Sequence, residues 1–291
     1  MLLVVIGGAV GAAIILVGAR GNDHSKAFVE TPWFLIWLLL IAAQTALWAV
    51  SAPVFVNAWL RLRRFGTRDL GIWIASAAFA AAVAATAAFP ALVHSLELHS
   101  PLSHHRLRIS LLLGLGTAVA LVGVQAVALV HRAARARTAT LKDGLAHFLF
   151  LREELQTLLF FLGTIIGAAT LASGALRIAL IDYGATDAQK FPAAAVLAYG
   201  GYFTLLLVAV YAPAYAALLA LGKHLRDEIC GALPAKPEDP GTWAEWQSRR
   251  STVEGFLQLN VSAGDRLKTG LAILAPFAGS AISLLLGTGT S

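Results

Sequence analysis

Charged residues are scarce in this chain. Asp, Glu, Lys and Arg together make up 13% of its 291 residues, whereas 58% are hydrophobic. A soluble globular domain usually carries about 25% charged residues, so this composition excludes an ordinary soluble protein. It predicts an all-α integral membrane protein with no room for a large soluble domain.

Cysteine and catalytic motifs are also lacking. Cys230 is the one cysteine of the chain, which excludes an internal disulfide and a cysteine-cluster metal site. The sequence has no nucleotide-binding loop, haem motif, zinc-ligand pattern or nucleophile elbow. We therefore expect no enzymatic activity, no catalytic residue, no cofactor and no bound metal.

The apolar runs contain no Asp, Glu, Lys or His near their expected centres. Proton-coupled pumps and carriers usually place such a residue within the membrane, and intramembrane hydrolases need a nucleophile and base or metal ligands at depth. Neither pattern is visible, so the sequence indicates a function without a buried coupling charge.

Hydrophobic runs indicate about six membrane spans, because about 20 apolar residues cross a bilayer at roughly 1.5 Å per residue. An amphipathic helix over 141–154 is expected to lie on the membrane surface ahead of the fifth span. Gly7 and Gly11, four residues apart, are typical of a helix face that another helix approaches closely. The predicted bundle covers 1–221, with spans near 2–18, 32–56, 70–92, 109–130, 155–181 and 192–221.

The tail is predicted to have two parts. Residues 222–265 form a cytoplasmic linker and an amphipathic helix, which Thr242 and Glu245 begin as a capping box. Residues 266–288 form an apolar segment that either spans the membrane or re-enters it, because Pro276 interrupts its helical pattern.

The net charge is +6. Nucleic acid is not the expected partner, because the arginines flank hydrophobic spans and lipid headgroups explain them better. The positive-inside rule places the basic loops, the tail and the amino terminus in the cytoplasm, and the abundance of alanine and arginine suggests a bacterial inner membrane. The basic loops contain Arg61, Arg63, Arg64, Arg68, Arg132, Arg135 and Arg137.

Polar residues within the spans are candidates for lining or gating a pore, since hydroxyl and amide groups can line a water-filled path. The alternative interpretation of the tyrosines is interfacial anchoring at the two ends of a span. The candidates are Gln44, Gln125, Tyr199, Tyr202, Thr204, Tyr211 and Tyr215.

Two further groups suggest regulation. Arg152, Glu153 and Glu154 are candidates for a latch that pairs with the basic loops, although exposed ion pairs contribute at most ~1 kcal/mol each. A loop with His94, His99, His104 and His105 could sense pH between about 5 and 7 or bind a metal. Its plain alternative is a solvated loop.

These features favour a homo-oligomeric ion channel or pore in a lipid bilayer. One alternative is a secondary transporter of a small solute, with a site near the middle of the membrane. The other is a non-transporting scaffold or sensor that recruits a cytoplasmic partner through 222–265.

Overall fold

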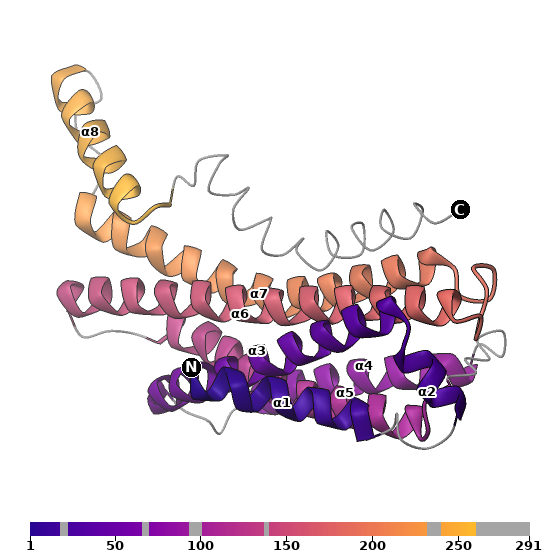
Figure 1. The fold of residues 1–291 in the computed structure, drawn as a ribbon. Helices are drawn as coiled ribbons and strands as arrows, with labels where there is room; N and C mark the ends of the chain where they lie inside the picture. The colour runs from indigo at the N-terminus through magenta and orange to yellow at the C-terminus, as the bar shows by residue number, and fades with distance from the viewer. Residues whose placement is uncertain (18–22, 66–69, 93–100, 137–139, 232–239, 260–291) are drawn as a thin grey trace.

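The computed structural model describes residues 1–17, 23–65, 70–92, 101–136, 140–231 and 240–259 (Figure 1). This part of the chain folds into helices without strands, which confirms the all-α prediction. In chain order the elements are α1 (Leu2–Leu16), α2 (Asp23–Val29), α3 (Pro32–Leu62), η2 (Arg63–Phe65), α4 (Leu70–Leu92), α5 (His105–Ala134), α6 (Leu141–Asp182), α7 (Ala193–Cys230) and α8 (Pro240–Phe256).

Four of the described helical segments are long and apolar enough to cross a membrane: Pro32–Phe65, His105–Ala134, Leu141–Asp182 and Ala193–Cys230. By length and composition, the chain is thus a multi-pass membrane protein with four candidate spans. Two other predicted spans fall on shorter apolar helices, Leu2–Leu16 and the stretch Ser76–Ala85 within α4. The predicted segment 266–288 lies outside the described residues.

The core forms around α6, the most buried of the four candidate spans. It packs against α3, α5 and α7, and α5 also contacts both α3 and α7. Figure 1 shows α6 and α7 side by side along most of their length. Because α6 is the most buried candidate span and contacts each of the other three, as α5 also does, the stretch from Leu141 to Asp182 forms the centre of the bundle.

The backbone of α6 does not break between the amphipathic stretch and the apolar span. A separate surface helix over 141–154 was expected, but the helix is continuous for 42 residues. It begins at Leu141 and is capped by Thr140, whose hydroxyl accepts a hydrogen bond from the Asp143 amide at 3.2 Å. The change from polar to apolar side chains does not end the helix, because its backbone hydrogen bonds do not depend on side-chain polarity.

Small residues bring α1 against α3. Gly7 and Gly11 are buried, and a Cβ atom added to Gly7 would lie 2.7 Å from both Ala49 Cβ and the Thr45 carbonyl oxygen. No side chain larger than hydrogen fits at this distance without movement of α1 or α3. The close-packing role predicted for the Gly7 and Gly11 pair is therefore confirmed.

Helix α8 folds back on the end of α7. It begins at Pro240, two residues before Thr242, so the predicted capping residue lies in its first turn. The Arg226 Nη1 atom lies 2.8 Å from Glu254 Oε1, and Arg250 Nε lies 3.1 Å from the same oxygen. Leu257, just after α8, is buried. The described part of the tail is thereby attached to the bundle.

Candidate functional site

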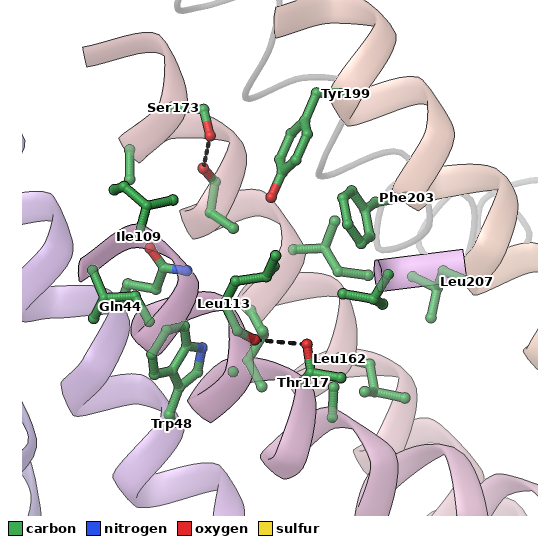
Figure 2. A pocket seen from close by; sticks show the side chains of 18 of the residues that line it. Gln44, Trp48, Ile109, Leu113, Thr117, Leu162, Ser173, Tyr199, Phe203 and Leu207 are labelled. Atoms are coloured by element: carbon green, nitrogen blue, oxygen red, sulfur yellow. Dashed lines mark hydrogen bonds between the residues drawn. The ribbon is translucent and has the colours of Figure 1, made fainter. Parts of the chain in front are cut away.

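A cavity of about 170 Å³ lies within the bundle, among α3, α4, α5, α6 and α7 (Figure 2). Most of its wall is apolar. The aromatic members of the wall are Trp37, Trp48, Phe79, Tyr199 and Phe203. Its aliphatic members include Ile41, Val83, Ile109, Leu112, Leu113, Val124, Leu162, Ile165, Leu176, Leu207 and Val210.

None of the described residues that line this cavity is Asp, Glu, Lys, Arg or His. Moving an unpaired charge into such surroundings costs many kcal/mol unless the charge is paired or solvated. The cavity is therefore suited to an uncharged molecule and unsuited to an ion.

Three polar side chains point into the cavity. Figure 2 shows the Gln44 amide, the Trp48 indole nitrogen and the Tyr199 hydroxyl directed toward its interior. Trp48 is 4% exposed, and its Nε1 atom has no hydrogen-bond partner among the described residues. A buried donor without an acceptor costs about 1–3 kcal/mol, so an acceptor atom in the cavity, of a water molecule or of a ligand, would remove this cost.

Two other hydroxyls in the wall are already engaged as donors. Thr117 Oγ1 donates to the Leu113 carbonyl oxygen at 2.6 Å, and Ser173 Oγ donates to the Ala169 carbonyl oxygen at 2.9 Å. Each bond closes within its own helix, as is usual for Ser and Thr at helical positions. Ser173 also forms a side-chain hydrogen bond with Tyr199, so of these two hydroxyls it is that of Thr117 that can still accept a hydrogen bond.

Gly116 makes room for the Trp48 ring. A Cβ atom at position 116 would lie 2.7 Å from Trp48 Cζ2, so the indole lies directly against the backbone of α5. Gln44 and Trp48 are four residues apart on α3 and therefore share one helix face. The position of the unpartnered N–H group is thus fixed by close packing between α3 and α5.

The polar residues predicted to line a pore do not all lie together in the structure. Gln44 and Tyr199 line the central cavity. Tyr202 donates from its hydroxyl to the Ala82 carbonyl oxygen at 2.8 Å and so joins α7 to α4, while Thr204 donates to the Gly200 carbonyl oxygen within α7. Gln125 is half-buried and lines neither this cavity nor the next one.

Tyr211 and Tyr215, near the middle of α7, line a second pocket of about 70 Å³ between α6, α7 and the tail. Their rings stack at 5.6 Å with an interplanar angle of 18°. Arg152 lines this pocket from α6, and Leu257 and Leu259 line it from the tail. The candidates for one path thus belong to two separate pockets.

The latch candidates are placed beside the basic segment at the end of α3. Arg61 Nη2 lies 2.7 Å from Glu154 Oε1, with the Glu154 side chain 8% exposed and that of Arg61 56% exposed. Glu153 is exposed. The pair joins α3 to α6, as expected of a latch, and its gating role stays a prediction.

The two predicted basic loops meet at this same end. Arg132 Nε donates to the Phe65 carbonyl oxygen at 3.0 Å. Arg64 lies over the Phe150 ring of α6 at 5.6 Å, and Arg63 lies over the Trp59 ring at 5.7 Å. Arg135 is exposed at the end of α5. Arg68 and Arg137 lie outside the described residues.

The histidine loop is described only at its end, since His94 and His99 lie outside the described residues. His104 precedes α5 with a left-handed backbone, φ 52°. The His105 ring lies 6.2 Å from that of Trp37, and its Nδ1 atom is buried without a partner in the described part of the chain. No group of three or more potential metal-ligating side chains occurs among the described residues.

Sequence reasoning missed Trp48. Its spacing from Gln44 was the available signal, because the two lie one helical turn apart. The signal was overlooked because only hydroxyl and amide side chains were considered as polar groups of the spans, although the indole of Trp48, near the middle of α3, is also a hydrogen-bond donor.

Comparisons with known proteins add no assignment: no family model, no curated protein and no solved structure matches the chain.

Proposed function

We propose that the protein is a multi-pass carrier that moves a small uncharged solute across a bacterial inner membrane. The observation that supports this proposal is the central cavity, which is lined by helices from most of the bundle and has inward-pointing polar groups. It adjoins the middle of the apolar part of α6, from Leu162 to Leu176. Carriers commonly bind their solute near the middle of the membrane. The proposal assigns the protein no chemical reaction.

The absence of ionisable groups from the described cavity wall selects the kind of carrier. Coupling to protons usually requires a carboxylate or histidine at the site. The proposed carrier therefore equilibrates its solute along the solute gradient alone.

Stopped-flow light scattering on proteoliposomes tests the proposal. After an osmotic upshift with glycerol, urea or nicotinamide, we expect at least one solute to enter faster than in protein-free liposomes, with a rate that saturates. Ala120→Phe places a ring into the cavity wall and should remove the acceleration. Trp59→Phe, on α3 but away from the cavity, is the matched control and should retain it. Entry at the protein-free rate for all three solutes contradicts the proposal.

The proposed topology has six spans, a cytoplasmic amino terminus and the basic segments of α3 and α5 in the cytoplasm. Single cysteines in a Cys230→Ser background test the orientation. Gln189→Cys, between α6 and α7, should react with a membrane-impermeant maleimide on intact spheroplasts. Lys142→Cys, at the start of α6, should react only after lysis. The opposite pattern would reverse the orientation.

A homo-oligomeric channel is the second candidate, with the path running between protomers. Gly114 and Gly201 favour it, because a Cβ atom at either position would meet nothing within 4 Å, so both leave room for a neighbouring helix. Discrete current steps in planar bilayers would support a channel. Replacing Arg61, Arg63 and Arg64 by Gln should then change ion selectivity, and unchanged selectivity would leave these residues as topology signals.

A further inference from the structure

From the central cavity we infer the class of molecule that it binds: an uncharged compound with a single six-membered ring and a carbonyl-type hydrogen-bond acceptor. This inference rests on the proposed function for the fate of the ligand, but its binding step stands without transport. It is argued from the size of the cavity, the composition of its wall and the hydrogen-bonding capacity of its polar groups.

The size of the cavity suits a ligand with one ring. The cavity measures about 170 Å³. An engineered apolar cavity of roughly 150 Å³ in another protein binds benzene. A substituted benzene ring is therefore of the right size to fill it.

The wall favours a ring over a flexible chain. Trp37, Trp48, Phe79, Tyr199 and Phe203 present aromatic surfaces around the cavity. Aromatic pairs gain about 0.5–1.5 kcal/mol beyond the burial of their area when the rings meet edge to face or offset. A ring also loses less conformational entropy on binding than a chain of the same volume.

The hydrogen-bond donors of the wall indicate that the ligand carries an acceptor. Trp48 Nε1–H is a donor only, and it has no partner among the described residues. The Gln44 amide, one turn away on the same face, also points inward (Figure 2) and can donate to a second lone pair of the same oxygen. One carbonyl oxygen between them would satisfy both donors.

The lack of charged side chains in the described wall argues against acidic and basic analogues of such a ring compound. No described residue of the wall carries a charge that could pair with a carboxylate or an ammonium group. A benzoate ion would be desolvated without compensation. The site should therefore distinguish a neutral carbonyl compound from an anion of nearly the same shape.

Two probes of matching shape test the acceptor requirement on the unmodified full-length protein. Acetophenone has a ketone oxygen where α-methylstyrene has a methylene group. Binding of tritiated acetophenone to the protein in lipid nanodiscs should be saturable after subtraction of empty nanodiscs. α-Methylstyrene should compete about tenfold more weakly, because it leaves a buried donor unpaired. Benzoate should not compete.

Substitutions locate the site. Trp48→Phe removes the N–H group and should weaken acetophenone binding, so that its advantage over α-methylstyrene becomes clearly smaller. Trp59→Phe makes the same change on α3 away from the cavity and should leave the preference intact. Ala120→Phe should abolish saturable binding.

Equal competition by the two probes in the unmodified protein would overturn the inference, as would undiminished binding in Ala120→Phe. The stopped-flow measurement separates these results from the proposed function. Selective acetophenone binding without accelerated solute entry would refute the carrier proposal and support the inferred ligand class. Saturable solute entry that Ala120→Phe removes, without any preference for the ketone, would support the carrier proposal and refute the inferred ligand class.

Discussion

The ion pair between Arg61 and Glu154 is asymmetric, and this asymmetry can be measured. Removal of one partner from a fully buried pair costs about 3–5 kcal/mol, whereas an exposed pair contributes about 0–1 kcal/mol. The Glu154 side chain is 8% exposed and that of Arg61 is 56% exposed. The two single substitutions should therefore have different costs.

Arg61→Gln leaves a buried carboxylate without its cation. We expect a loss of about 2 kcal/mol, between the limits for exposed and buried pairs. Glu154→Gln leaves a guanidinium that already reaches solvent and keeps a side chain of similar shape, so its cost should be about 0.5–1 kcal/mol. The double variant should resemble Glu154→Gln, because it has no stranded carboxylate.

Thermal unfolding of the detergent-solubilised protein, followed by circular dichroism, measures these differences. For a chain of 291 residues, a loss of about 2 kcal/mol corresponds to an apparent melting temperature lower by about 3 °C. Lys190→Gln is the matched control, because its pair with Asp187 is 65% and 57% exposed and its loss should stay within about 0.5 kcal/mol. The reasoning fails if Glu154→Gln destabilises the protein as much as Arg61→Gln.

Two further predictions each compare two positions in one helix. Gly116→Ala should lower the free energy of unfolding by about 1–3 kcal/mol, because the added methyl group overpacks against Trp48. Gly114→Ala has open space around it and should raise the free energy of unfolding by up to about 1 kcal/mol. The thermal unfolding assay measures both changes, and equal effects of the two substitutions would contradict the packing. Glu254→Gln should raise amide hydrogen exchange in α8 roughly tenfold, since it weakens charged hydrogen bonds, and unchanged exchange would show that these bonds do not hold α8. Arg249→Gln, an exposed change in the same helix, is its control.

Much of the helical architecture could be predicted from the sequence, because apolar length and small-residue spacing act locally. Gly7 and Gly11 correctly indicated a close helix contact, and the pairing of Glu154 with a basic segment followed from charge. The choice of Arg61 as its partner depends on how α3 and α6 pack, which no local pattern specifies.

The site was harder to predict for the same reason. Gln44 and Tyr199 were identified as polar residues within spans, but their meeting in one cavity depends on the arrangement of several helices. Tyr211 and Tyr215 satisfied the same criterion and line a different pocket. The continuity of α6 was missed because a change in side-chain polarity was interpreted as a change in structure.

Because α6 is continuous, a movement at one end of the helix is transmitted to its other end. The stretch from Leu141 to Glu154 is rigidly joined to the helix that lines the cavity, and at ~1.5 Å per residue it extends about 20 Å. If the Arg61–Glu154 contact acts as a fulcrum, this stretch is a lever arm. A rotation of about 10° there displaces the Leu141 end by roughly 3–4 Å. The residues of α6 that line the cavity, Leu162 to Leu176, lie about 12–33 Å from Glu154 on the other side. Such a rotation would therefore move the cavity wall and the basic end of the protein by comparable distances.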